Sequence, residues 1–201
     1  MQDKNYYKHI DGLRALAVTL VFLCHLEFTF FSGGFVGVDV FFVISGFLIT
    51  NIIIQQLNSP YGFSFLNFYD RRIKRIFPAL FFTLFFSFIA GFVLLNPAEF
   101  KMFGKSLSFA ALSISNIFFK NQSGYFDIFS QSSPLLHTWS LGVEEQFYIF
   151  FPIILFFGHK FFKKKLVVII AFVLIISFLL NLYYQNSSLV DLYYLAQYRA
   201  F

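Results

Sequence analysis

The chain of 201 residues is rich in apolar side chains, with 58% hydrophobic and only 12% charged residues. A soluble domain of this size does not need so apolar a composition, so the sequence predicts a membrane protein. The net charge of +5 would suit nucleic acid, but the basic residues cluster beside apolar segments, where they determine topology. We therefore expect no nucleic-acid partner and an all-α, polytopic integral membrane bundle of about five to six membrane segments.

The polar leader of residues 1–11 is mildly basic and predicts a cytoplasmic N-terminus. The first apolar run, of residues 12–31, is long and lacks a small-residue cleavage pattern, so we expect it to remain as a membrane anchor. Cys24 is the single cysteine, which excludes an internal disulfide and a cysteine-based metal cluster. No histidine spacing or carboxylate cluster typical of a metal site is present, so none is expected.

This first segment carries Arg14 and His25, eleven positions apart. At about 100° per residue both side chains lie on one helix face, about 16 Å apart along the axis. An ionisable group near mid-membrane costs about 3 kcal/mol or more unless it is paired or faces a cavity, so His25 is a candidate functional group. Arg14 could bind an anion at the cytoplasmic surface while His25 acts as a general base. Alternatively, the arginine snorkels and the histidine bonds between helices.

Residues 32–34, Ser-Gly-Gly, predict a tight turn before a second span of residues 35–54. Asp39 lies inside this span and is a candidate for the same reason as His25. The alternative interpretation is that Asp39 pairs with Arg14 or with a backbone amide.

Residues 71–75 hold four cations, the strongest cytoplasmic marker in the chain. Apolar side chains alternate with these cations over residues 65–76, which predicts an amphipathic interfacial segment before a third span of residues 80–95. Arg72 and Arg75 are neighbours on a helix face and could grip phosphates, because the planar guanidinium suits them. The alternative is a topological stop signal that contacts lipid headgroups.

Residues 101–120 do not fit strict alternation, because a full fourth span there would place the basic residues 159–165 outside. The run between Lys105 and Lys120 holds only fourteen residues, fewer than the roughly 20 that a spanning helix needs. We therefore prefer a re-entrant or interfacial helix over a full span. Two further spans are expected, one inward (139–157) and one outward (166–182).

Two acids, Glu144 and Glu145, enter the start of an apolar segment within residues 137–148. Because the residues from Tyr148 onward are almost wholly apolar, we expect Glu144 inside the bundle and treat it as a candidate catalytic group. The alternative is a solvated helix start, where acids are favourable near the N-terminus.

Four ordered stretches resemble the acyltransferase-3 family of integral membrane acyltransferases, which includes bacterial O-antigen and peptidoglycan O-acetylases. The first is YKHIDGLRALA at residues 7–17, which leads into Arg14 and His25. The others are GFVGVDVFFVISGFLIT at 34–50, FYDRRIKRIFPAL at 68–80 and PLLHTWSLGVEEQFYIFFP at 134–152. Residues 198–201 resemble the beginning of a further motif. The resemblance implies that residues 1–201 are the N-terminal part of a longer transmembrane acyltransferase-3 domain.

The resemblance further implies transfer of an acyl group, usually acetyl, from cytoplasmic acyl-CoA to a sugar hydroxyl of an extracytoplasmic glycan, such as peptidoglycan or lipopolysaccharide. In such an enzyme His25 would meet the thioester and either deprotonate the accepting hydroxyl or carry the acyl group. Asp39 or Glu144 would orient or charge-stabilise the imidazole. The residues that would hold the phosphates of the donor are Arg14, Arg72 and Arg75.

We therefore expect acetyl-CoA as a co-substrate without a metal, and a glycan acceptor and membrane lipid as partners. The expected location is the bacterial cytoplasmic (inner) membrane, and the parent chain could carry an SGNH-type periplasmic domain, as some relatives do. The alternative function is a transporter or flippase with Arg14, Asp39 and His25 as a relay. A transporter should show discontinuous helices in corresponding halves, and no such duplication is visible in the sequence.

Overall fold

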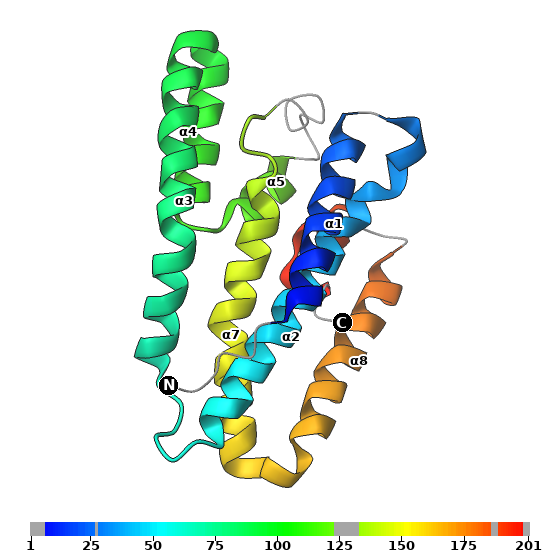
Figure 1. Cartoon of the computed structure of the whole chain (residues 1–201). Helices are drawn as coiled ribbons and strands as arrows, with labels where there is room; N and C mark the ends of the chain where they lie inside the picture. Colours follow the sequence, from blue (N-terminus) through cyan, green and yellow to red (C-terminus); the bar gives the residue numbers. More distant parts are fainter. Residues whose placement is uncertain (1–6, 27, 123–132, 186–188, 199–201) are drawn as a thin grey trace. The chain divides into compact units, whose positions relative to one another are not determined.

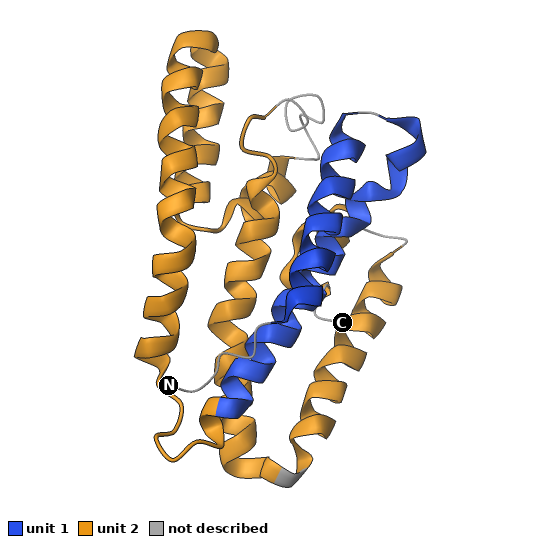
Figure 2. Cartoon of the chain, in the orientation of Figure 1, with its two compact units in different colours: residues 1–55 blue, residues 56–201 orange. Residues whose placement is uncertain are grey.

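A computed structural model of the chain describes residues 7–26, 28–122, 133–185 and 189–198 (Figure 1). Every regular element among these residues is a helix, which confirms the predicted all-α class. Four helical stretches are long and apolar enough to cross a membrane, which confirms the predicted membrane protein. They are Thr29–Leu57, Phe65–Leu94, Thr138–Phe162 and Leu166–Tyr184. The chain divides into two compact units, residues 1–55 and 56–201 (Figure 2), and each is described by itself.

The first unit pairs two antiparallel helices, α1 (Lys8–His25) and α2 (Gly37–Leu57), through the 3-10 helix η1 (Thr29–Val36). At the start of α1, Tyr7 packs its ring against Phe47, and its hydroxyl accepts a hydrogen bond from the Asn51 side chain at 3.1 Å. These contacts join the N-terminal end of α1 to the C-terminal half of α2.

Two details of the first unit differ from the sequence-based expectation. The first helix ends at His25 rather than near residue 31, and residues 32–34 lie inside η1 rather than in a tight turn. The chain turns back early because Gly34 and Gly37 let η1 and α2 approach the backbone of α1 closely. Helix α1 also carries charged residues in its first two turns, and it is not among the four candidate spans.

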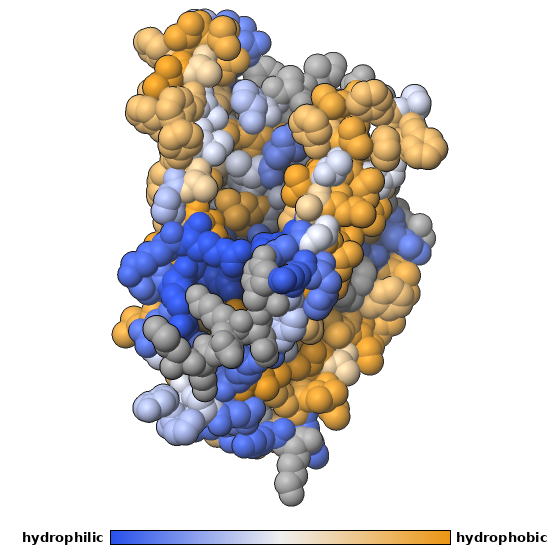
Figure 3. Space-filling model, in the orientation of Figure 1, coloured by the Kyte–Doolittle hydropathy of each residue, from blue (hydrophilic) through white to orange (hydrophobic). Residues whose placement is uncertain are grey.

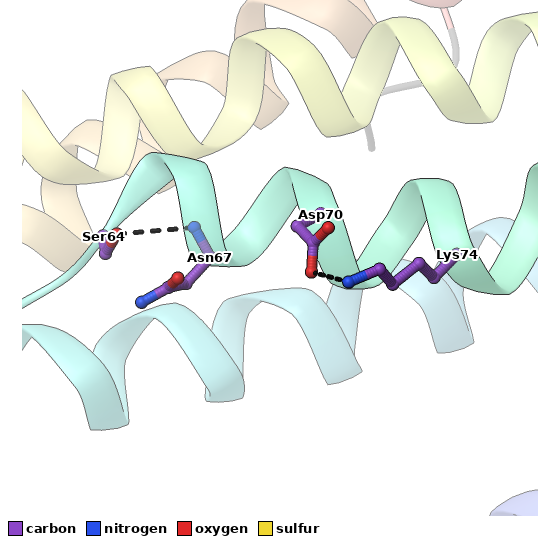
Figure 4. Close-up of polar contacts among 4 residues, drawn as sticks. All are labelled: Ser64, Asn67, Asp70 and Lys74. Carbon is purple, nitrogen blue, oxygen red and sulfur yellow. Dashed lines mark hydrogen bonds and ion pairs between the residues drawn. The ribbon is translucent and has the colours of Figure 1, made fainter.

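The second unit begins with α3 (Phe65–Leu94). The Ser64 side chain caps its first turn by accepting a hydrogen bond from the backbone N–H of Asn67 (Figure 4). Its 30 residues extend about 45 Å at 1.5 Å per residue, more than the hydrocarbon core of a bilayer. The predicted interfacial segment and third span are therefore one helix, which continues through Pro78.

Helix α4 (Pro97–Ala111) returns along the C-terminal half of α3 (Figure 1), starting from a capping box between Asn96 and Glu99. The chain breaks at Ser113, whose φ of 57° is left-handed, and continues as α5 (Ser115–Gln122). Residues 101–120 thus lie in two short helices, neither of them among the four candidate spans, and their re-entrant or interfacial position stays a prediction. The side of the membrane on which they lie stays a prediction.

The remaining elements are α7 (Thr138–Phe162), η2 (Lys163–Lys165), α8 (Leu166–Tyr184), α9 (Leu189–Tyr194) and η3 (Ala196–Tyr198). A buried cluster joins α3, α4 and the approach to α7: Leu80, Leu84, Phe103, Ala110 and Leu135. The space-filling view is hydrophobic over α8 and over α4 with the C-terminal half of α3 (Figure 3). Hydrophilic surface gathers instead over the N-terminal half of α3, so one helix combines an apolar half with a cationic half.

Candidate functional site

The candidates of the first unit depend on a close contact between α1 and the start of α2. A Cβ added at Gly37 would lie 2.5 Å from the Ala17 carbonyl oxygen and 2.8 Å from Val21 Cγ2. At Gly34 an added Cβ would meet the backbone of Leu20. Because the backbones approach so closely, α1 cannot rotate about its own axis. The contact therefore also orients the side chains of α1 that lie next to it.

Arg14 and His25 follow the same three-four spacing as Ala17 and Val21, so they flank the contact with Gly37 on one face of α1. Arg14 is half-buried and His25 is exposed. The structure thus confirms that both lie on one helix.

The His25 ring is oriented by its own helix. Its Nδ1 lies 2.7 Å from the carbonyl oxygen of Val21. A carbonyl can only accept, so Nδ1 carries the proton, and in the neutral ring Nε2 carries the lone pair. Nε2 is therefore the atom of His25 that can take a proton or attack an electrophile. Asp39 lies in the same unit, half-buried in the first turn of α2.

In the second unit the N-terminal half of α3 lies antiparallel to α7. Phe65 packs its ring against Phe156, with centroids 5.3 Å apart. One turn further along α3, the Tyr69 hydroxyl donates to the Ile149 carbonyl oxygen at 3.0 Å. Long side chains rather than close backbones make these contacts, and they place the next turn of α3 beside the first half of α7.

That next turn brings Arg72 between two aromatic rings. Its guanidinium carbon lies 5.7 Å from the centroid of Phe68 and 5.1 Å from that of Tyr148. Both distances are within the range of cation–π attraction, and the two aromatic residues are 2% and 4% exposed. The half-buried guanidinium makes no hydrogen bond or ion pair with any described residue, so its donors suit an anion.

Two carboxylates lie beside this arginine. Tyr148 donates its hydroxyl to the carboxylate of Glu144, one turn earlier on α7. Glu145 is half-buried, and its Oε1 has no hydrogen-bond donor within the described part of the chain. The charges of both acids attract Arg72. The structure therefore joins two separately predicted candidates, Arg72 and Glu144, through Tyr148.

The other cations of α3 differ in their surroundings. Lys74 pairs with Asp70 at 2.8 Å on the exposed side of the helix (Figure 4). Arg75 lies one turn beyond Arg72, is exposed, and repels the Arg72 charge. Arg72 and Arg75 therefore form a positively charged pair, as their spacing predicted.

The opposite side of α7 is held by polar contacts to α5. Asn116 is fully buried, and its amide donates to the Tyr194 carbonyl oxygen at 3.0 Å. Gln146 donates to the side-chain oxygen of Asn116, also at 3.0 Å. Gly142 makes room for this amide, because an added Cβ would lie 2.7 Å from the Asn116 oxygen. These contacts explain the glycine and the glutamine of the motif around Glu144.

Two members of this arrangement, Phe68 and Tyr148, were not predicted from the sequence, and Glu145 was noted beside Glu144 without being a candidate itself. The available signal was the helical spacing: Phe68 precedes Arg72 by four positions, and Tyr148 follows Glu144 by four. The approach of Tyr148 to Arg72 had no sequence signal, because it joins two distant helices. Among the described residues no cluster of three or more histidine, cysteine or acidic side chains could hold a metal ion.

The acyltransferase domain of the acyltransferase-3 family matches residues 7–200. The chain is 38% identical over 157 residues to a putative peptidoglycan O-acetyltransferase, YrhL, of Bacillus subtilis (strain 168), covering 78% of this chain and 25% of the relative. It is 40% identical over 164 residues to the O-acetyltransferase OatA of Staphylococcus aureus (strain NCTC 8325 / PS 47), covering 80% of this chain and 27% of the relative. Against the peptidoglycan O-acetyltransferase OatA of Listeria monocytogenes serovar 1/2a (strain ATCC BAA-679 / EGD-e), identity is 41% over 155 residues, covering 76% and 25%.

The chain spans about a quarter of the length of these curated relatives. No solved structure is significantly similar to it. The family match nevertheless covers almost the whole chain and includes every candidate residue described above. The chain therefore belongs to the acyltransferase-3 family.

Proposed function

We propose that the full-length protein is a membrane O-acyltransferase that moves an acyl group, most simply acetyl, from cytoplasmic acyl-CoA to a hydroxyl of a cell-envelope glycan. The family match supports the reaction class. The structural observation that carries the proposal is the half-buried Arg72 guanidinium, held over two rings with no carboxylate paired to it in the described residues. Such a group suits an anionic donor.

Arg14, Arg72 and Arg75 are the proposed contacts for the phosphates of coenzyme A. The diphosphate and 3′-phosphate of this donor present oxygens that a planar guanidinium can bind through two parallel hydrogen bonds. The exposed Arg75 and the half-buried Arg72 lie one turn apart on α3, so one phosphate group can contact both.

His25 is the proposed catalytic group, acting through Nε2. As a general base it takes the proton of the acceptor hydroxyl while the hydroxyl oxygen attacks the thioester carbonyl, and the coenzyme leaves as a thiolate that takes up a proton. In a two-step route Nε2 attacks the thioester carbonyl and expels the coenzyme as a thiolate. The sugar hydroxyl then displaces the imidazole from the acyl group, and its proton passes to the thiolate. The hydrogen bond from Nδ1 to the Val21 carbonyl supports both routes, because it leaves the lone pair on Nε2.

Asp39 and Glu144 are the proposed acids that stabilise the charge of the imidazole. Asp39 belongs to the same unit as His25, which supports it for this role. Glu144 accepts the Tyr148 hydroxyl beside Arg72 in the second unit, and its proposed role at the imidazole rests on its place in the motif of residues 134–152.

Peptidoglycan is the proposed acceptor, because two of the relatives are named peptidoglycan O-acetyltransferases. These two names support peptidoglycan over lipopolysaccharide as the acceptor. The cationic half of α3 supports a bacterial cytoplasmic-membrane protein whose N-terminus and donor site face the cytoplasm. An SGNH-type domain elsewhere in the full protein could receive the acyl group on the outer side.

The test uses membranes that contain the full-length protein, supplied with acetyl-CoA labelled on the acetyl group. We expect label in peptidoglycan, and a loss of at least about 100-fold in the initial rate for His25→Ala. His9→Ala, an exposed histidine on the same helix, is the matched control at equal protein level. Absence of transfer from every acyl-CoA supplied would refute the proposal and favour a transporter, whereas an active His25→Ala variant would refute only the role of His25.

A further inference from the structure

We propose that Tyr148 is a positioning residue for Arg72, and that it keeps this guanidinium both oriented and free of the Glu144 carboxylate. The inference rests on the proposed function, because it takes Arg72 as a contact for the donor phosphates. It concerns the contact between α3 and α7 inside the second unit.

The ring of Tyr148 supplies the orientation. It lies 5.1 Å from the Arg72 guanidinium carbon, and only 4% of the residue is exposed. Phe68, with 2% exposed, approaches the same guanidinium at 5.7 Å. Contact with the rings restrains the guanidinium without using its N–H groups, so its donors remain available for hydrogen bonds with an anion.

The hydroxyl of Tyr148 supplies the protection. Glu144 and Glu145 both attract Arg72, and an arginine beside a carboxylate ordinarily forms a two-point ion pair that uses its donors. Here Tyr148 donates to Glu144, and no carboxylate of the described chain pairs with Arg72 within 4.0 Å. Removal of the hydroxyl would release the Glu144 carboxylate to compete with a phosphate for the guanidinium.

Neighbouring contacts fix the two partners relative to each other. Tyr69, three residues before Arg72, donates its hydroxyl to the carbonyl oxygen of Ile149, the residue after Tyr148. On its other side, α7 is held by the hydrogen bond from Gln146 to Asn116. Tyr148 therefore approaches Arg72 in a defined register and has little freedom to turn away.

The experiment measures KM for acetyl-CoA and kcat in membranes with the full-length protein. We expect Tyr148→Leu to raise KM about tenfold and Tyr148→Phe about threefold, with kcat at saturating donor within about twofold of native. In an Arg72→Ala background, neither Tyr148 substitution should raise KM further, because the group that Tyr148 positions is gone. Phe150→Leu is the matched control, since Phe150 lies on the same helix and is 62% exposed, and its KM should stay native.

The outcomes separate the two proposals. If native membranes transfer no acyl group from acyl-CoA, the proposed function is wrong. If native membranes are active, an unchanged KM in Tyr148→Leu, or an equal rise with and without Arg72, overturns the positioning role alone. If Tyr148→Leu does not accumulate, Tyr148→Phe keeps the packing and decides by the same comparison, and an unchanged KM in that variant overturns the inference.

Discussion

One helix contact in each unit is built in the opposite way from the other: α1 with η1 and α2 in the first unit, and α3 with α7 in the second. In the first unit α1 meets η1 and α2 at backbone distance, where Gly34 and Gly37 leave no space for a side chain. In the second unit α3 reaches α7 through long side chains, among them Tyr69 and Arg72. The first contact is therefore a steric one, and the second is made by aromatic rings and polar atoms.

The close contact in the first unit suits the orientation of side chains, whereas the looser contact between α3 and α7 suits the binding of a ligand. Close backbones leave almost no freedom, so α1 can present Arg14 and His25 from a fixed face. Helices held apart by long side chains leave room for a half-buried cation, and the Arg72 guanidinium occupies that room between Phe68 and Tyr148. A charged group at such a contact keeps its donors for a ligand when rings contact it and no carboxylate forms an ion pair with it.

The largest effect is expected from Gly34→Ala in the first unit. The added Cβ would collide with the backbone of Leu20, which cannot move aside, so the free energy of unfolding in detergent should fall by at least about 2 kcal/mol. Gly33→Ala is the matched control, because no atom lies within 4 Å of its added Cβ. Equal unfolding energies for the two variants would contradict the close contact.

A smaller loss is expected when a buried polar contact of the second unit is removed. Asn116→Ala leaves the Tyr194 carbonyl and the Gln146 amide without their partner, which should cost about 1–3 kcal/mol of unfolding free energy. Asn121→Ala, at an exposed position of the same helix, should stay close to native. Denaturant unfolding in detergent compares the two, and a loss no larger than that of the control would rule out Asn116 as a structural link.

The α3–α7 contact should be weakened modestly by Tyr69→Phe. This substitution keeps the ring and removes the hydrogen bond to Ile149, so we expect a loss of about 1 kcal/mol. Tyr61→Phe, at a position 98% exposed, removes a hydroxyl without a packed neighbour and serves as the control. Unfolding energies that fall equally in both variants would show that Tyr69 does not join the helices.

The smallest effect is expected at the exposed ion pair of α3. Asp70 and Lys74 have side chains that are 55% and 74% exposed, so Asp70→Ala should change the unfolding free energy by less than about 0.5 kcal/mol. A double-mutant cycle with Lys74→Ala isolates the pair. A coupling well above this value would mean that the pair is shielded from solvent.

Much of the fold could be predicted from the chain because the signals are local. Long apolar runs predicted the membrane helices that follow Ser64, His137 and Lys165, and the short run between Lys105 and Lys120 predicted the lack of a full span there. Boundaries were less predictable. The early end of α1 at His25 depends on Gly34, because this glycine lets η1 pack against the backbone of Leu20. The sequence does not show which backbone a glycine will pack against.

The candidate site also has features that local signals predict and features that they do not. Helical spacing alone placed Arg14 with His25, and Arg72 with Arg75, since positions three, four and eleven apart share a face in any α-helix. Glu144 was predicted as a candidate because it is an acidic residue at the start of an apolar segment. The sequence by itself thus determined the membrane class, the helices and the residues that share each helix face.

Only the tertiary structure decided which faces meet. The approach of Tyr148 to Arg72 and the engagement of Glu144 by the Tyr148 hydroxyl join groups whose environment depends on how α3 and α7 pack. The distinction between Glu144, which accepts that hydroxyl, and Glu145, whose Oε1 has no donor in the described chain, has the same origin. Contacts between distant helices depend on packing rather than periodicity, and no local pattern of residues encodes them.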